Sequence, residues 1–483
     1  MTLHRREVLG SLGAASASTL LWALGCSAPA PLVRRAPQVS GEVRTWLHDA
    51  VSRLATLYAT VHALAVSRRR VTAARDVLGA GVGRLRAEGV ILTVRSRDGA
   101  WHDHVTSELS RDGVDAAARA LGAGRRASSI DFGRAPPTPD EPPALDEREL
   151  LHRVDPLLQA DAVLAPRIVY AAAAIDLDDA IVWSVAPGRD LEQRLVRIRQ
   201  IALRAAGSGS RPVVREAERA WSGWLDDQPL TPADLIAASE AALQVITPGG
   251  FEDGERPVVL DPSVVAVVLD AVARGLLTAA AARRPEVARR LAAIAASDSL
   301  ASPLLTLIDD PTIPGAYGGF AFDDEGEPAA PITLVDAGRI AAQLSDRAGD
   351  GAGGGAGRGR RPGHLGHVQP APSHLRLVPG TAELPQLLGD GFLLQGGVAA
   401  TLDPSGERIR VACTHARELK AGNTTGRLYA DVELVGPLTA LLTAIDAVAA
   451  TPTVFASRGP IWRSISAPAV RTRGFVRAVR TRA

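Results

Sequence analysis

The sequence has almost no excess charge, few cysteines and no apolar run long enough to cross a bilayer. Lysine and arginine total 54 against 53 aspartates and glutamates, a net charge of +1. No strong field therefore favours nucleic acid or acidic substrates, and we expect no nucleic-acid partner. The small and apolar run at residues 10–25 is too short for a transmembrane helix. Hydrophobic residues make up 46% of the 483, an ordinary share for a globular protein with ample core.

The first forty residues have the pattern of a targeting segment. Arg5 and Arg6 precede the short apolar run, as in a twin-arginine export signal. The chain from Ala23 to Cys26 is similar to a lipoprotein cleavage box, which predicts a signal peptide at 1–26 and a lipidated Cys26. The Ser-, Ala- and Pro-rich residues 27–40 would then be a tether. The alternative is an accidental cysteine in a plain signal peptide.

These features predict an exported protein held in the cell envelope, on its periplasmic side, by a lipid anchor in the membrane. Cys413 is then the only thiol left, and a single thiol cannot form an internal disulfide. Cys413 and His415 lie on one face of an expected strand. A nucleophilic pair would need a third orienting group and a recognisable local signature, so we interpret Cys413 as a small buried residue.

Breaks in composition divide the remainder of the chain. Residues 41–124 combine helix and strand patterns, and residues 125–146 form a linker rich in proline. Residues 147–250 contain strands followed by a closing helix, with strands expected at 167–175, 180–186, 191–206 and 213–220. The final domain is expected at 251–483, with a helix at 437–449 and its last strand at 469–479.

Residues 257–278, PVVLDPSVVAVVLDAVARGLLT, organise this final domain. A short strand is expected at 257–260, and Asp261 and Pro262 offer an N-cap and a first-turn proline. Apolar residues then recur at helical spacing, which predicts a buried helix: Val265, Val268, Leu269, Val272 and Leu276.

This strand and helix, with their "PVVL-x-P" entry, resemble the zinc helix of the TldD/PmbA (TldD/TldE) metallopeptidase family. The segments ASPLLTLIDDPTIPGAYGGFAFDDEGEP at 301–328 and ARELKAGNTTGRLYADVELVGPLTALLTAIDAVA at 416–449 extend the resemblance. It implies a multi-domain α+β fold. The expected parts are an α/β N-terminal domain, a small middle domain, and a C-terminal domain with a large, mostly antiparallel sheet.

The resemblance also implies where zinc would bind, because catalytic family members carry His-Glu-x-x-x-His on this helix and a cysteine in a later loop. Here Asp270, Ala271 and Gly275 occupy the motif positions, and the loop at 455–459 has no cysteine. Glycine has no ligand atom and alanine cannot accept a proton. Arg274 lies one turn from Asp270 and can pair with it. We therefore expect no catalytic residues and no bound zinc.

An alternative metal site remains open at this stage. By the resemblance, Arg360 and Arg361 begin an extended segment that lines the substrate cleft, and this segment contains His364, His367 and His374. These imidazoles could form a substitute metal site with Asp270, although their spacing on an extended chain does not enforce a shared face. The acidic residues at 309–310 and 323–325 are typical of tight turns beside proline and glycine.

Three functions follow from these observations. The main hypothesis is a non-catalytic family member that binds peptide or forms a heteromer with an active, zinc-bearing homologue. The second is an active metallopeptidase with the substitute metal site. The third is a structural lipoprotein of the envelope.

Overall fold

The structure is a computed structural model that describes residues 40–122, 147–159, 164–207, 213–247, 250–297, 299–349, 357–363, 366–457 and 459–479. The chain divides into two compact units. The first contains the described residues up to Gln244 together with Asp324–Gly326 and Arg361–His367, and the second contains the rest. Both units combine helices with β-sheet, so the predicted α+β class is confirmed. Cys26 and the predicted linker lie outside the described residues.

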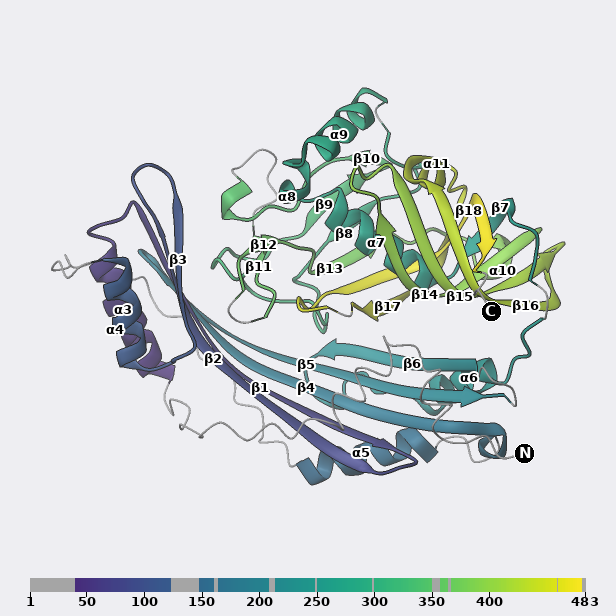
Figure 1. The fold of residues 1–483 in the computed structure, drawn as a ribbon, viewed down its shortest axis with the longest axis horizontal. Helices are drawn as coiled ribbons and strands as arrows, with labels where there is room; N and C mark the ends of the chain where they lie inside the picture. Colours follow the sequence, from purple (N-terminus) through teal and green to yellow (C-terminus); the bar gives the residue numbers. More distant parts are fainter. Residues whose placement is uncertain are drawn as a thin grey trace. The chain divides into compact units, whose positions relative to one another are not determined.

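The first unit is built on an antiparallel sheet in which six strands are described (Figure 1). Their order is β3-β2-β1-β4-β5-β6. The ranges 41–124 and 147–250, which the sequence suggested as separate domains, both contribute strands to it, because β1 pairs with β4 along its length. The strands are β1 (Thr60–Asp76), β2 (Ala80–Arg95), β3 (Trp101–Thr106), β4 (Ile168–Ala186), β5 (Arg189–Ala206) and β6 (Val213–Ser222).

Strand β4 corrects the sequence prediction, which placed two strands in this range. The strand is continuous over 19 residues and carries Asp176, Asp178 and Asp179 at its centre. Each carboxylate pairs with an arginine of a neighbouring strand: Arg70, Arg68 and Arg194, respectively. Cross-strand ion pairs therefore compensate the acidic residues that suggested a break.

Helices pack on one face of this sheet. The apolar residues of α3 (Ser40–Leu54) and α4 (Arg111–Leu121) form a core with β1, β2 and β4, and those of α5 (Glu147–Gln159) and α6 (Pro232–Ala242) form a second one. Side chains cap two of these helices. Ser110 Oγ accepts a hydrogen bond from the Gly113 backbone N–H at 3.1 Å, and Thr231 with Asp234 forms a capping box.

The second unit contains a sheet in which ten strands are described. The order is β10-β9-β8-β13-β18-β16-β15-β14-β7, with β17 beside β18, and β7 also pairs with β18 so that five strands close a ring. Most pairs are antiparallel, as expected. The strands are β7 (Gly254–Leu260), β8 (Leu307–Asp309), β9 (Ile332–Asp336), β10 (Arg339–Ile340), β13 (His374–Leu377), β14 (Gly391–Leu402), β15 (Arg408–Lys420), β16 (Asn423–Pro437), β17 (Ala447–Ala456) and β18 (Ser464–Ala478).

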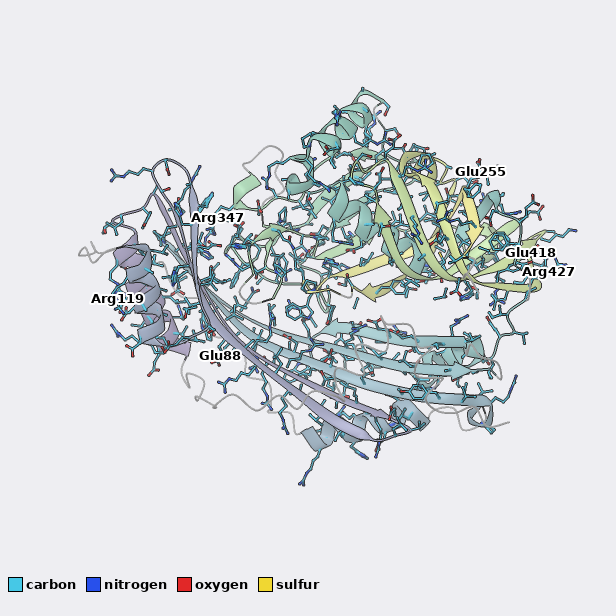
Figure 2. All side chains as sticks on the ribbon, in the orientation of Figure 1. Glu88, Arg119, Glu255, Arg347, Glu418 and Arg427 are labelled. Atoms are coloured by element: carbon cyan, nitrogen blue, oxygen red, sulfur yellow. The ribbon has the colours of Figure 1, made fainter. Side chains whose placement is uncertain are left out.

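Helix α7 (Pro262–Gly275) is the most buried helix described in this unit. Its apolar residues share one core with β7, β14, β15 and β18. The remaining helices are α8 (Ala279–Ala282), α9 (Pro285–Ser297), α10 (Leu384–Leu387) and α11 (Leu438–Thr443), and β11 (Gly359–Arg360) pairs with β12 (Gln369–Pro370). Charged side chains such as Glu255, Glu418 and Arg427 extend from the surface of the unit (Figure 2).

Helix α11 is shorter than the sequence predicted. The expected helix at 437–449 ends at Thr443, and β17 begins at Ala447. The backbone of Ala447 and Val448 pairs with β18, so strand pairing overrides the local helical preference of this alanine-rich stretch. Among the described residues, no helix is both long enough and apolar enough to traverse a bilayer.

Candidate functional site

Helix α7 is held firmly at its N-terminus. The Asp261 carboxylate accepts hydrogen bonds from the Val264 N–H at 2.9 Å, the Gly396 N–H at 3.2 Å and the Ser263 hydroxyl at 2.6 Å. Burial raises the pKa of this carboxyl, although each of these hydrogen bonds acts to lower it. Pro262 supplies the first-turn position. The cap therefore joins the helix to strand β14 and fixes the side chains that α7 presents.

Asp270 lies at the centre of the site, 8% exposed on the buried face of α7. Its carboxylate is engaged by two guanidinium groups. Arg274 Nε donates to Oδ2 at 2.8 Å, one helical turn away, which confirms the predicted pair. Arg463, immediately before β18, donates from Nε to Oδ1 at 3.0 Å and from Nη2 to Oδ2 at 3.4 Å.

The loop after β17 reaches the same place. Ser457, in the loop where the family resemblance implies a cysteine ligand, accepts a hydrogen bond from Arg463 Nη2 at 2.6 Å. The helix position of Asp270 and the loop position of Ser457 therefore meet at one guanidinium. Arg458, in the same loop, lies outside the described residues.

The other two motif positions carry no polar side chain. Ala271 is buried within α7, and Gly275 is the last residue of the helix. A Cβ placed on Gly275 would lie 2.8 Å from Leu402 Cδ1, so the side chain of Leu402 from β14 fills the space beside this position. A larger residue at 275 would require Leu402 to move.

The electrostatics of the site are those of a buried ion pair next to further positive charge. Burial lowers the pKa of the Arg463 guanidinium, the Asp270 carboxylate raises it, and the charges of Arg274 and Arg360 lower it again. A positive group thus lies against Asp270, where a metal ion would have to bind if this carboxylate were a ligand.

The three predicted histidines do not share a described site with Asp270. His374 is buried on β13, and its Nδ1 lies 2.8 Å from Ser464 Oγ. Burial lowers the pKa of His374, which favours the neutral imidazole. His367 is exposed and belongs to the first unit, and His364 lies outside the described residues. In the part of the chain that the structure describes, no three His, Cys, Asp or Glu side chains are grouped to hold a metal.

The two arginines expected along a substrate cleft are both buried and are assigned to different units. The guanidinium of Arg360 lies over the ring of Phe320, 4.5 Å from its centroid. Arg361 contacts Asp103 through Nη1 at 3.3 Å and donates to the Gly366 carbonyl at 2.7 Å.

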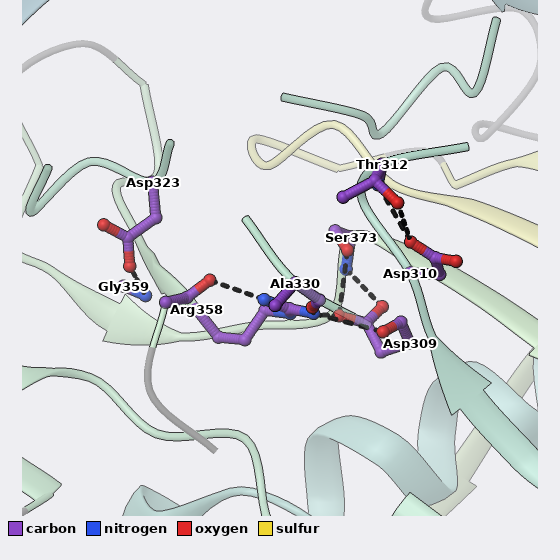
Figure 3. A network of polar contacts seen from close by, with 9 residues as sticks. Asp309, Asp310, Thr312, Asp323, Ala330, Arg358, Gly359 and Ser373 are labelled. Atoms are coloured by element: carbon purple, nitrogen blue, oxygen red, sulfur yellow. Dashed lines mark hydrogen bonds and ion pairs between the residues drawn. The ribbon is translucent and has the colours of Figure 1, made fainter. Parts of the chain in front are cut away.

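The acidic residues at the end of β8 and after it have structural partners (Figure 3). Asp309 forms an ion pair with Arg358 in which both side chains are fully buried, and it also accepts hydrogen bonds from the backbone and hydroxyl of Ser373 at 2.8 Å. Asp310 accepts from the Thr312 N–H at 3.0 Å, and Asp323 from the Gly359 N–H at 2.8 Å. The predicted turn role is confirmed for Asp310 and for Asp323, whose Oδ1 accepts from the Glu327 N–H at 2.9 Å. Asp309 and the Oδ2 of Asp323 bond more distant segments.

Cys413 is buried on β15, and burial raises the pKa of its thiol above the ordinary value. The thiolate needed for nucleophilic attack is therefore disfavoured. This agrees with the interpretation of Cys413 as a packing residue.

Arg463 is the site residue that sequence reasoning did not identify. Its signal is weak: a single charge in the otherwise apolar or small sequence GPIWRSISAPAV. A charged residue flanked by strand-forming apolar residues indicates a buried partner, because an unpaired buried charge is strongly disfavoured.

Comparison with known proteins agrees with this architecture. Residues 253–478 match the family described as PmbA/TldA metallopeptidase C-terminal domain. A metalloprotease of Methanothermobacter thermautotrophicus is 23% identical over 383 residues, which cover 75% of this chain and 82% of that protein. A metalloprotease of Methanocaldococcus jannaschii is 26% identical over 219 residues, 44% of this chain and 47% of that protein.

Solved structures share the fold. TldE from Thermococcus kodakarensis has a TM-score of 0.71 at 14% identity and covers 90% of this chain and 100% of its own. A proposed modulator of DNA gyrase from Thermotoga maritima has a TM-score of 0.71 at 16% identity, covering 91% of this chain and 100% of its own. The domain match and the metalloprotease relatives show that this chain is similar to TldD/PmbA metallopeptidases, most clearly over residues 253–478, and the solved structures show that it shares their fold.

Proposed function

We propose that this chain is an exported lipoprotein and a non-catalytic member of the TldD/PmbA family. In this proposal it binds peptide or forms a heteromer with an active, zinc-bearing homologue. The observation that carries the proposal is the engagement of Asp270 by Arg463 and Arg274. Both oxygens of this carboxylate accept hydrogen bonds from guanidinium groups, whose positive charges oppose the binding of a divalent cation beside it.

The residues present do not fit the zinc site that the family implies. A hydrolytic zinc site needs about three protein ligands and a base for the bound water. Ala271 offers no base, Gly275 offers no ligand, and Ser457 has a hydroxyl that is a poor zinc ligand and already bonds Arg463. The guanidinium of Arg463 would also repel a divalent cation beside Asp270. We therefore assign no hydrolytic step to this site.

The proposed location rests on the leader sequence. Arg5, Arg6 and the short apolar run support export, and Cys26 supports lipidation and attachment to the envelope membrane on its periplasmic side. The described part of the second unit then forms the C-terminal part of the anchored protein.

The proposal is tested by comparing peptide binding with peptide cleavage. Purified protein is incubated with zinc and a fluorescent unstructured peptide, and anisotropy reports binding while mass spectrometry reports cleavage. We expect binding without cleavage, and the same result for Asp270→Asn. Cleavage by the wild-type protein that Asp270→Asn abolishes would instead support an active metallopeptidase with a substitute site.

A pull-down from envelope extract with the anchored protein tests whether the chain forms a heteromer with a zinc-bearing homologue. We expect a homologue with an intact His-Glu-x-x-x-His helix to co-purify if the chain works as a heteromer. Failure of both peptide binding and co-purification would favour a structural role in the envelope.

A further inference from the structure

The arginines around Asp270 carry more positive charge than that carboxylate can balance. Arg274 and Arg463 both donate to Asp270, so two guanidinium groups share one negative charge. Neither arginine forms an ion pair with any other carboxylate of the described residues. One positive charge of the cluster is therefore left without a carboxylate among the described residues.

The two arginines differ in how many of their hydrogen-bond donors are already used. Arg463 is held on several sides, by Asp270, by Ser457 and, at 3.5 Å, by the Ile461 carbonyl. Arg274 uses only Nε, and its two terminal nitrogens make no hydrogen bond to the described residues. Its side chain is 48% exposed, so these donors are open to solvent.

The backbone packs closely against Arg463. A Cβ on Gly318 would lie 3.0 Å from the Arg463 Cα and 1.9 Å from the Ser373 carbonyl oxygen, so the chain at 318 packs directly against the base of this arginine. The Gly318 N–H also donates to Ser464 Oγ at 3.2 Å. The positive charge of Arg463 is therefore held in place beside the open nitrogens of Arg274, so binding an anion there orders little of Arg463.

We propose that Arg274 and Arg463, arranged around Asp270, form a binding site for an oxyanion, either the terminal carboxylate of a peptide or a free inorganic oxyanion. The planar fork of a guanidinium matches a carboxylate or phosphate with two parallel hydrogen bonds. The open nitrogens of Arg274 supply such a fork. The charge of Arg463 is buried, so water screens its attraction for the anion only weakly. The bound anion balances the unmatched charge of the cluster.

This inference rests on the proposed function, since it takes the place beside Asp270 to hold no metal. It deepens that function by naming the chemical group that the ligand presents. The titrations use protein stripped of metal on a chelating resin, with no soluble chelator present, so they give an answer about anion binding whatever the cleavage experiment finds with zinc.

Calorimetric titration of the mature protein with three probes tests the site. The probes are N-acetyl-trialanine with a free carboxylate, the same peptide with a C-terminal amide, and inorganic phosphate. We expect the carboxylate peptide or phosphate to bind, and the amide peptide to bind at least about tenfold more weakly than the carboxylate peptide, because it cannot form a charge-assisted pair. Preference for the carboxylate peptide identifies a peptide terminus, whereas binding of phosphate alone identifies a free oxyanion.

Variants decide whether the binding belongs to this cluster. Arg274→Gln keeps the length of the side chain and removes the charge, and we expect it to weaken binding by about tenfold to a hundredfold. Arg274→Lys should restore part of the affinity. Arg289→Gln, an exposed arginine on α9, is the matched control and should bind as the wild type does. The inference is overturned if no probe binds, or if Arg274→Gln binds as tightly as Arg289→Gln.

Discussion

At the residue scale, the buried ion pair of Asp270 and Arg463 has the largest expected effect on stability. Both side chains are largely removed from water, so each charge depends on the other for compensation. Replacing such a pair by apolar residues is often nearly neutral, whereas removing one partner leaves an uncompensated buried charge. The pair thus contributes less to net stability than its loss by single substitution would suggest.

A single substitution in this pair is therefore expected to be costly. Arg463→Met should reduce the free energy of unfolding by about 3–5 kcal/mol, because Asp270 loses the partner that is itself buried. The double variant Asp270→Leu with Arg463→Met should recover most of that loss. Urea unfolding followed by circular dichroism measures both variants. A loss below about 1 kcal/mol in the single variant would mean that Arg274 and solvent already compensate Asp270.

His374 makes the stability of the protein depend on pH. Burial lowers the pKa of this imidazole in the folded state, so below the unfolded-state pKa, about 6.5, the unfolded chain binds more protons than the folded one. The contribution of His374 is therefore present at neutral pH and is lost as the pH falls, by up to about 1.4 kcal/mol per pH unit.

Urea midpoints measured between about pH 7.5 and 5 test this dependence. We expect His374→Asn to flatten the decrease towards low pH. His367→Gln, which removes an exposed imidazole, serves as the control and should keep the wild-type slope. Equal slopes for wild type and His374→Asn would contradict the assignment.

At the scale of elements, the Asp261 cap fixes the position of α7, and with it the position of Asp270, relative to β14. Asp261 bonds the first turn of the helix and also the backbone of Gly396 in β14. Asp261→Ala should therefore destabilise the protein by about 1–2 kcal/mol or somewhat more, because the cap is lost and the Gly396 N–H also loses its acceptor. Asp261→Asn keeps an oxygen acceptor, so it should lower the free energy of unfolding by clearly less than Asp261→Ala does. A cost for Asp261→Ala within about 0.3 kcal/mol of zero would show that the cap is dispensable.

Elements marked by local chemistry were predictable from the sequence. Helix α7 begins and is buried as its cap and apolar spacing indicated, and the caps of α4 and α6 follow their sequence signals. The unbroken β4 and the early end of α11 were not predictable. Both depend on partners distant in sequence: arginines on neighbouring strands for β4, and the backbone of β18 for α11.

In the site too, the local contact was predictable from the sequence and the distant contact was not. The pair of Asp270 with Arg274 follows from helical spacing. The contact with Arg463 spans 193 positions of sequence and arises only when β18 lies beside α7, and no local pattern encodes this approach.

At the scale of the whole molecule, the C-terminal domain and the leader sequence carry separate parts of the proposed function. The C-terminal family match covers residues 253–478, and solved structures share the fold across most of the chain. The anchor itself is a proposal that rests on Cys26 in the leader.

Substitution of Cys26 tests this anchor. Cys26→Ser removes the thiol that would carry the lipid, so we expect the protein to move from the detergent phase to the aqueous phase in Triton X-114 partition. The wild-type protein should remain with the detergent because acyl chains supply the membrane affinity. Cys413→Ser, which changes the buried cysteine, is the matched control and should partition as the wild type does. Detergent partition of Cys26→Ser would place the anchor elsewhere.

Zinc content distinguishes an ion-paired carboxylate at Asp270 from a zinc ligand. The mature protein is purified without chelator, equilibrated with zinc, dialysed, and measured by inductively coupled plasma mass spectrometry beside Asp270→Asn. Because Arg463 and Arg274 engage the carboxylate, we predict zinc well below one ion per chain and no difference between the two proteins. One zinc per wild-type chain that is lost in Asp270→Asn would contradict the account.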